Sequence, residues 1–240
     1  MISISCPSRG RPQLAKRMID TAYNTAADDI EFLIYLNNDD PALEEYKDTI
    51  DKKHYTVGPN RSTCYSWNLM AEKARYDYVF LAGDDIQFKT ENWDTKMVDG
   101  FTNYPDKILM AIPYDGKDKN KPKNLLNAKE PTLIGDVPFS SPHFLVHKNW
   151  INTLGYFVPP FFWHWYVDTY TQKVSRKLNR CLYLPDVTIK AKKVFDDTGK
   201  QVRKHLDINF RDDYVWSKIR ERHLNADVDA LKKFIKDFKK

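Results

Sequence analysis

The stretch Tyr-Asp-Tyr-Val-Phe-Leu-Ala-Gly-Asp-Asp, residues 76–85, joins a nearly continuous apolar run to a glycine and two aspartates. Continuous apolar runs are typical of parallel strands that are covered by helices on both faces. We therefore expect residues 76–82 to form a central strand of an α/β sheet. Ligands of such sheets gather at the carboxyl ends of the strands, so Asp84 and Asp85 are placed where a site is expected.

The chain on either side of this strand alternates between apolar runs and helical stripes. Further strands are predicted at residues 1–6, 30–37, 54–57, 108–113 and 144–146. Apolar side chains at helical spacing predict helices over residues 14–22, 43–50, 67–74, 167–178 and 228–238. The polar stretch 114–130, with five lysines, is interpreted as a mobile loop. Strands alternating with helices imply an α/β fold with a mostly parallel sheet and a helical C-terminal tail.

Composition excludes several classes of protein. Hydrophobic residues make up 42% of the 240 residues and aromatic residues 14%, while 8 glycines and 13 prolines are too few for a low-complexity chain. No window approaches the roughly 18 consecutive apolar residues of a membrane span, and the first residues lack a signal-peptide pattern, which predicts a cytoplasmic protein. Cys6, Cys64 and Cys181 are widely spaced, so we expect reduced core cysteines.

The formal net charge of +5 is unevenly distributed. Basic and acidic residues are balanced at 23 each through Pro185, and number 15 and 10 afterwards. A basic C-terminal portion can hold an anionic partner such as nucleic acid. A charged, solvated surface is the simpler interpretation.

The familiar nucleotide-binding motifs are missing. No two of the eight glycines are close enough to form Gly-x-Gly-x-x-Gly, and neither Gly-Lys pair has the earlier glycine of a P-loop. The nucleophile motif Gly-x-Ser-x-Gly is absent as well. His143 and His147 have the spacing of a zinc pair, but Phe144 stands where a zinc protease has glutamate, so we interpret them as strand histidines.

Charged and polar residues follow four of the predicted strands. They are Pro7, Ser8, Arg9 and Arg11 after the first, Asp39 after the second, Arg61 after the third, and Asp84 and Asp85 after the fourth. Arginines suit phosphate oxygens, and carboxylates suit a hard divalent cation. The adjacent pair Asp84 and Asp85 favours a cation site, although a polar loop with one helix-capping aspartate would look the same.

Taken in order, these motifs resemble the GT-A glycosyltransferases, in particular inverting family 2-like enzymes of phage type. The resemblance rests on the Pro-Ser-Arg-Gly-Arg-Pro loop at 7–12, Asn-Asp-Asp at 38–40, the helix led by Arg61, and Ala-Gly-Asp-Asp at 82–85. It continues through Leu-Gly-Tyr-Phe at 154–157 to Trp-Tyr-Val-Asp at 165–168 and covers roughly residues 1 to 180.

This resemblance implies a role for each candidate residue. The donor nucleotide would be bound by Pro7, Ser8, Arg9, Arg11, Asp39, Arg61 and Asp84. Asp85 would hold a divalent cation, Mn²⁺ or Mg²⁺, and Asp168 would be the catalytic base. Gly83 replaces the first carboxylate of the usual Asp-x-Asp, and valine replaces the glutamate that usually precedes the base. A late metal-binding histidine has only His205 as a poor candidate.

The resemblance also implies an organisation and a reaction. One domain, 1–240, would comprise a nucleotide-sugar-binding half at 1–88, an acceptor half at 89–185, and a basic, partly helical tail at 186–240. The donor would be a UDP- or GDP-linked sugar. A cation at the leaving diphosphate and a base at the incoming hydroxyl are what such a transfer needs.

The acceptor site is predicted from the aromatic residues. Seven of the eleven residues from Tyr156 to Tyr166 are aromatic, and planar rings stack on sugars and nucleobases. We assign Phe161 and Phe162 to the core, and Trp163 and Trp165 to the acceptor.

Basic composition and the phage-type resemblance favour a hydroxymethylated pyrimidine in DNA as the acceptor; a polysaccharide or protein acceptor is the alternative. Two other functions remain open, a metal-dependent nucleotidyltransferase and a non-catalytic nucleic-acid-binding protein.

Overall fold

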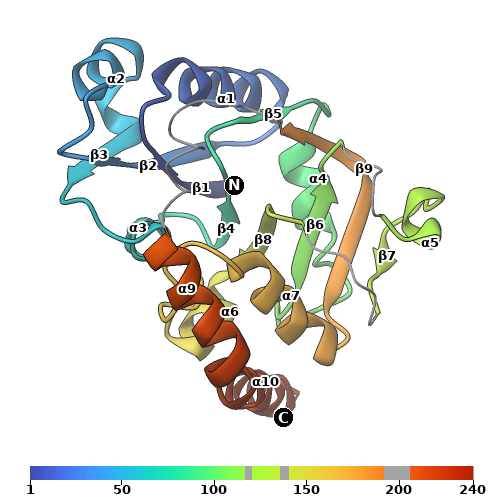
Figure 1. Cartoon of the computed structure of the whole chain (residues 1–240). Coiled ribbons are helices and arrows are strands. Elements are labelled where there is room, and N and C mark those ends of the chain that lie inside the picture. The colour runs from blue at the N-terminus through green and yellow to red at the C-terminus, as the bar shows by residue number, and fades with distance from the viewer. Residues whose placement is uncertain (117–120, 136–140, 192–205, 240) are drawn as a thin grey trace.

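The computed structural model describes residues 1–116, 121–135, 141–191 and 206–239. In this part of the chain one sheet of nine strands runs through the molecule, in the order β3-β2-β1-β4-β8-β6-β9-β5, with β7 paired to β9. Helices cover it above and below in the view of Figure 1. The strands are β1 (Ile2–Ser8), β2 (Ile30–Asn37), β3 (Tyr55–Gly58), β4 (Tyr78–Leu81), β5 (Ile86–Phe88), β6 (Met110–Tyr114), β7 (Thr132–Leu133), β8 (Phe144–His147) and β9 (Cys181–Ala191).

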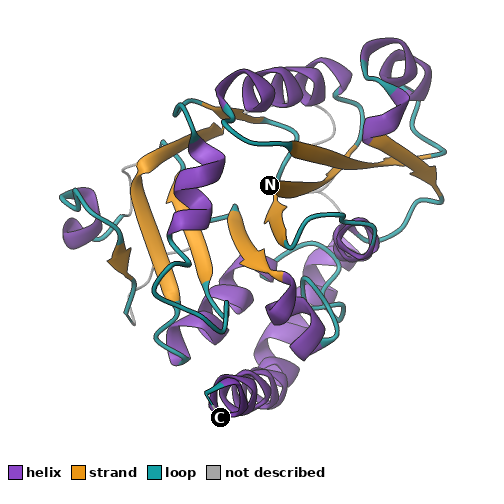
Figure 2. Cartoon of the chain, turned by 180° about the vertical axis from the view of Figure 1, so that it is seen from behind, coloured by secondary structure: helices purple, strands orange, loops and turns teal. Residues whose placement is uncertain are grey.

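The helices lie in two layers, one on each side of the sheet, as the reverse view of Figure 2 also shows. The first layer holds α1 (Pro12–Thr25), α2 (Leu43–Thr49) and α4 (Trp93–Asp99). The second holds α3 (Thr63–Glu72), α6 (Lys148–Leu154), α7 (Val167–Lys177) and α10 (Arg220–Phe238). Each layer has its own cluster of buried apolar side chains. The predicted α/β fold with a mostly parallel sheet flanked by helices is therefore confirmed.

The first four strands run parallel and determine where a site can form. β1 pairs with β2 and with β4, and β2 pairs with β3, all in parallel. In the register, Ser8 lies opposite Leu36 and Ser5 opposite Leu81. The carboxyl ends of these strands therefore meet at one edge of the sheet, and so do the loops that follow them.

The local sequence explains where the helices next to the parallel strands begin. Pro12 occupies the start of α1, where its missing N–H is tolerated, and Ala15, Met18 and Ala22 are buried against the sheet. α3 begins after Ser62, whose hydroxyl accepts a hydrogen bond from the Tyr65 N–H at 3.1 Å. Ser62 therefore caps the amino end of α3.

The second half of the sheet is mixed, which the alternation of strands and helices does not predict. β8 runs antiparallel to β4 and β6, and β5 runs antiparallel to β9. The predicted strand at 54–57 is also preceded by a short 3-10 helix, η1 (Lys52–His54). The parallel pairings are those among β1 to β4 and that of β6 with β9.

In the stretch 114–130, which the sequence analysis interprets as a mobile loop, the described residues also include the end of a strand and a short helix. Tyr114 ends β6, and α5 (Lys123–Leu126) places Leu125 in the core at 1% exposure. The Lys121 ammonium lies 3.9 Å from the centre of the Tyr114 ring and 3.6 Å from the Asp115 carboxylate. Aromatic and acidic neighbours thus compensate the burial of this polar sequence.

The C-terminal tail is helical, as predicted, but it is also part of the core. α9 (Leu206–Tyr214), the π-helical turn η2 (Val215–Ile219) and α10 follow one another without a break. Leu224, Val228 and Leu231 are buried in the cluster shared with α6 and α7. None of the helices among the described residues is long and apolar enough to cross a lipid bilayer.

Candidate functional site

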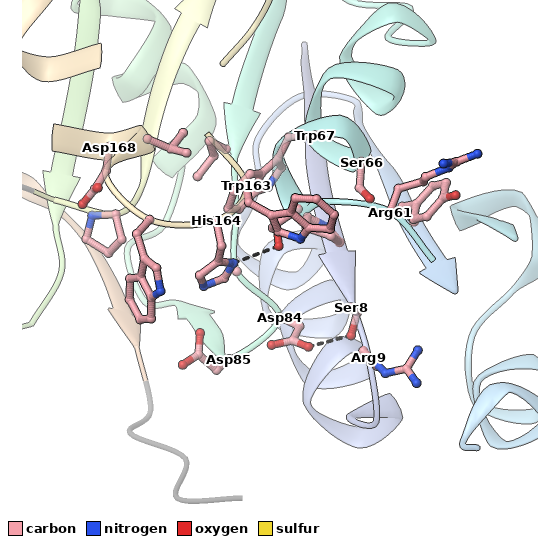
Figure 3. Close-up of a pocket in the computed structure, with 18 of the residues that line it drawn as sticks. Ser8, Arg9, Arg61, Ser66, Trp67, Asp84, Asp85, Trp163, His164 and Asp168 are labelled. Carbon is pink, nitrogen blue, oxygen red and sulfur yellow. Dashed lines mark hydrogen bonds between the residues drawn. The ribbon is translucent and has the colours of Figure 1, made fainter. Parts of the chain in front are cut away.

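The carboxyl ends of the parallel strands open into a cavity of about 610 Å³. Its walls come from the loops after β1, β3 and β4, from the start of α3, and from the segment that leads into α7 (Figure 3). All but one of the predicted site residues line it, namely Pro7, Ser8, Arg9, Arg11, Arg61, Asp84, Asp85, Trp163, Trp165 and Asp168. The fold therefore brings residues from positions 7 to 168 to a single cavity.

Asp39, the remaining predicted residue, is not among those that line the cavity. Its carboxylate forms an ion pair with Arg9 at 2.5 Å and accepts a hydrogen bond from the Asn60 amide at 3.0 Å. The hydrogen bonds from Arg9 and Asn60 lower the pKa of Asp39. In this structure Asp39 holds Arg9, which does line the cavity.

Asp84 holds the loop that follows β1 in place. Its carboxylate accepts a hydrogen bond from Ser8 at 2.6 Å and forms an ion pair with Arg11 at 3.0 Å. Tyr46 of α2 extends the network, because its hydroxyl lies 2.6 Å from the Ser8 hydroxyl and accepts from the Arg11 N–H at 2.9 Å. Burial raises the pKa of Asp84 to about 6, although Arg11 and Ser8 act in the opposite direction.

Asp85 differs from its neighbour in being open to the cavity. Its side chain is half-buried, and no residue in the described part of the chain forms a hydrogen bond or ion pair with its carboxylate. A Cβ atom at position 83 would lie 3.1 Å from Asp85 Oδ1 and 3.5 Å from His143 Cε1. Glycine at 83 therefore leaves room for the carboxylate beside the His143 ring.

The residues present fit a divalent cation that is completed by a ligand. No group of three or more histidine, cysteine or acidic side chains among the described residues forms a metal site by itself. Magnesium in phosphate-transferring sites is commonly bound by one or two carboxylates, with substrate phosphates and water completing its shell. Asp85 offers one such carboxylate, whereas both oxygens of Asp84 already bind Ser8 and Arg11.

Asp168 is the second residue of α7 and faces the same cavity. The Thr169 hydroxyl approaches its carboxylate at 3.4 Å. Burial raises the pKa of Asp168, with the hydrogen bonds from Thr169 opposing the rise. A carboxylate with a raised pKa is a better proton acceptor near neutral pH than an ordinary aspartate.

The segment 163–165, which carries both candidate acceptor residues, is held by the C-terminal helices. Asp212 of α9 is fully buried and accepts hydrogen bonds from the backbone N–H groups of Trp163, His164 and Trp165, at 2.7, 2.9 and 2.8 Å. The Trp165 indole N–H donates to Asn209 at 2.6 Å. The tail therefore determines the position of this wall of the cavity.

Helix α3 holds the same segment from the side of the cavity that carries Arg61. The Cys64 N–H donates to the Trp163 carbonyl at 3.3 Å, and the Thr63 hydroxyl lies 2.8 Å from His164 Nδ1. Both tryptophans remain 36% exposed, and the Arg211 guanidinium lies 5.1 Å from the Trp163 ring centre. Trp163 and Trp165 thus offer exposed indole surface at the cavity.

Several residues that line the cavity were given no role in the site by the sequence analysis. They include Tyr35, Asn37, Asn60, Ser66, Trp67, His143 and His164. Trp67 lies on the predicted apolar stripe of its helix, and His143 precedes a predicted strand, so both looked structural. No sequence pattern indicated that Asp212 contacts the site, since it lies 44 residues after Asp168 in a helix without a motif. His205, the predicted late histidine, lies outside the described residues.

Comparison with known proteins gives one family match. The model of glycosyl transferase family 2 matches residues 3–163, which is more than half of the chain. That range ends before Asp168 and the C-terminal helices. A sequence search of curated proteins finds no match.

Solved structures resemble this chain in fold. S. aureus TarS 1-349 in complex with UDP-GlcNAc superposes with a TM-score of 0.61 at 12% identity, over 82% of this chain and 59% of that chain. The mannosyltransferase PcManGT from Pyrobaculum calidifontis, in complex with GDP-Man and Mn²⁺, gives a TM-score of 0.60 at 12% identity. The superposition covers 97% of this chain and 74% of that chain. This chain thus spans less than two thirds of the TarS fragment. At such low identity the likeness shows the fold, and it agrees with the GT-A architecture.

Proposed function

The chain belongs to glycosyl transferase family 2, and from this premise we propose that it transfers a sugar from a nucleoside diphosphate sugar to an acceptor hydroxyl, with inversion. The observation that carries the proposal is the presence of Asp85, Arg61 and Asp168 in one cavity of about 610 Å³. Cavities of this size accommodate ligands of several hundred daltons. UDP-GlcNAc and GDP-mannose, the ligands named for the two similar structures, are the donors to test.

The donor half of the cavity suits a diphosphate. Asp85 would hold a divalent cation, Mn²⁺ or Mg²⁺, together with the diphosphate oxygens, and Arg61 would add positive charge nearby. The bound cation supplies Lewis-acid stabilisation of the negative charge on the leaving diphosphate. The loop that carries Arg9 and Arg11, braced by Asp39 and Asp84, would hold the nucleoside.

Asp168 would act as the base. In an inverting transfer the bond between the acceptor oxygen and the anomeric carbon forms as the bond to the diphosphate oxygen breaks. The proton of the acceptor hydroxyl moves to the Asp168 carboxylate. Burial raises the pKa of Asp168, which strengthens it as a base. Trp163 and Trp165 would stack on the acceptor beside it.

A hydroxymethylated pyrimidine in DNA is the acceptor that the basic surplus after residue 185 favours. A polysaccharide or protein hydroxyl is the alternative. The helical tail itself contributes nothing to that surplus, because residues 206–238 contain seven basic and seven acidic residues. The surplus comes from residues 186–205, which contain six basic and three acidic residues, and from Lys239 and Lys240 at the end of the sequence.

The test is metal-dependent binding of a nucleoside diphosphate. We expect UDP or GDP to raise the melting temperature of the wild-type protein in the presence of Mn²⁺ but not in its absence. Asp85→Asn removes the charge that holds the cation and should abolish this rise. Asp48→Asn changes an exposed aspartate on α2 outside the cavity and should retain it. Absence of a shift with every nucleotide in the wild-type protein would contradict the proposal.

A further inference from the structure

His164 lies in the cavity wall between the two predicted halves of the reaction. It lines the same cavity as Asp85 and Asp168, and it precedes Asp168 by four residues. Its ring contacts Thr63, which lies two residues after Arg61 on the donor side. In Figure 3 the ring is drawn between Trp163 and the pair Asp84 and Asp85.

Three contacts fix the orientation of this ring. The backbone N–H of His164 donates to Asp212 at 2.9 Å, and Nδ1 lies 2.8 Å from the Thr63 hydroxyl. The ring also packs edge-on against Trp165, with 4.8 Å between the ring centres. Within the described residues no protein group bonds to Nε2. A ring held at one nitrogen, with the other available at a cavity wall, is pre-organised for a ligand.

The charge state of His164 restricts what this ligand can be. Burial lowers its pKa, and the nearby Asp212 only partly opposes the effect. A neutral imidazole has one donor nitrogen and one acceptor nitrogen. It therefore suits a hydroxyl group, which can donate or accept, whereas a phosphate is bound better by the cation and Arg61.

The order of groups along the reaction places the sugar near His164. The anomeric carbon must lie between the leaving diphosphate, which Asp85 would hold through the cation, and the acceptor hydroxyl next to Asp168. In Figure 3 His164 is drawn between Asp168 and Asp85, and all three residues line the same cavity. A sugar that spans these two aspartates would therefore lie beside His164.

We propose that His164 Nε2 binds a hydroxyl group of the transferred sugar and so contributes to the choice of donor sugar. This inference rests on the proposed function, because it requires a nucleoside diphosphate sugar in the cavity. It adds a sugar-binding residue to a wall whose other members, Trp163 and Trp165, are assigned to the acceptor.

Two substitutions separate the two ring nitrogens. His164→Asn places its amide near the position of Nδ1, so the Thr63 contact can persist while the cavity contact is lost. His164→Gln reaches the position of Nε2 and can replace the cavity contact. His223→Asn is the matched control, since His223 stacks on Phe161 from α10 and does not line the cavity.

The measurement is isothermal titration calorimetry with Mn²⁺, using UDP and GDP alongside UDP-GlcNAc and GDP-mannose. In His164→Asn we expect the affinity for the free nucleotide to stay within about twofold of wild type, while the affinity for the sugar nucleotide falls roughly tenfold, the effect of one lost hydrogen bond. His164→Gln should recover part of that loss. His223→Asn should match the wild type.

Each other outcome has a distinct meaning. If His164→Asn weakens the free nucleotide and the sugar nucleotide equally, His164 only supports the wall and the inference is overturned. If both affinities of His164→Asn equal those of the wild type, His164 Nε2 does not bind the sugar and the inference is overturned as well. If the wild-type protein binds no nucleotide at all, it is the proposed function that fails.

Discussion

Asp84 and Asp85 are adjacent in the chain but make different contacts. Both oxygens of Asp84 are used by Ser8 and Arg11, so this residue ties the loop after β4 to the loop after β1. Asp85 keeps its carboxylate at the cavity. Two neighbouring carboxylates can therefore coexist without a cation between them, because an arginine and a hydroxyl neutralise the first.

Asp168 gives a prediction about pH. In its proposed role as the base Asp168 must be ionised, so activity would be lost as the pH falls through its pKa. Since burial raises that pKa, the loss should begin at a higher pH than the ordinary aspartate value of about 3.9 would give. The measurement is the rate at which nucleoside diphosphate is released from the donor, with water as the acceptor, between pH 4 and 8.

The Asp168→Asn variant tests the assignment directly. We expect the rate to fall roughly 10²- to 10⁴-fold, the usual contribution of a positioned base, while the affinity for the nucleoside diphosphate is retained. Asp207→Asn, an exposed position in the first turn of α9, should behave as wild type. A full rate in Asp168→Asn with an unchanged pH profile would show that another group takes the proton.

At the residue scale the sequence predicted most of the cavity, and the reason is the parallel sheet. Residues that follow parallel strands share one edge, so Ser8, Arg11 and Asp84 could be grouped from their order alone. His164 could not, because its place in the cavity depends on contacts with α3 and α9 that have no sequence signal. Asp39 does lie at the predicted edge of the sheet, but its side chain forms an ion pair with Arg9 and does not line the cavity.

At the scale of elements, the contact between α9 and segment 163–165 is the least expected feature. One buried carboxylate accepts three consecutive backbone N–H groups. Such an arrangement stabilises a segment that makes no regular secondary structure, and it does so next to the start of α7. The position of Asp168 and of the two tryptophans therefore depends on a helix that follows them by about forty residues.

Substitution of Asp212 tests this dependence. Asp212→Ala leaves three backbone N–H groups without their acceptor, so we expect a loss of about 3 kcal/mol in the free energy of unfolding. Because Arg61, Asp84 and Asp85 belong to other loops, the affinity for the nucleoside diphosphate should change less than twofold. Urea unfolding and nucleotide titration measure the two effects.

The neighbouring residue supplies the control. Asp213 bonds to the exposed Tyr166 hydroxyl instead of to the backbone. Asp213→Asn should therefore cost less than 1 kcal/mol. Equal stability of the Asp212→Ala and Asp213→Asn variants would mean that the segment does not need α9.

Three strands of the sheet were not predicted from the sequence, for physical reasons. β5 has three residues and β7 has two, which is too short for a period to be recognised. β9 contains Pro185, Asp186 and Lys190 among its apolar residues, so its pattern is broken even though Leu182, Leu184 and Ile189 are buried. Apart from β3 at the edge of the sheet, the strands that were predicted are largely buried, and their apolar runs are nearly continuous.

For the whole molecule, the distribution of charge bears on the acceptor. The helices after residue 205 are electrically balanced and pack into the core, so they are not a basic arm. Three of the five excess basic charges lie between residues 186 and 205, and the other two are Lys239 and Lys240; residues 192–205 and 240 are outside the described part. A DNA acceptor would therefore be held by few phosphate contacts beyond those at the cavity.

A salt titration measures how many phosphate contacts the protein makes, and so tests DNA as the acceptor. With about three phosphate contacts, a rise from 50 to 200 mM salt should weaken binding to duplex DNA containing hydroxymethylated pyrimidines roughly 40-fold, because each contact releases condensed counterions. Fluorescence anisotropy of a labelled duplex measures this dependence. Lys233→Ala, on α10, should leave the slope unchanged, since residues 206–238 carry equal numbers of basic and acidic residues and add no net attraction. An affinity that does not change over this range would exclude phosphate contacts and direct the search for the acceptor to an uncharged polysaccharide or a protein hydroxyl.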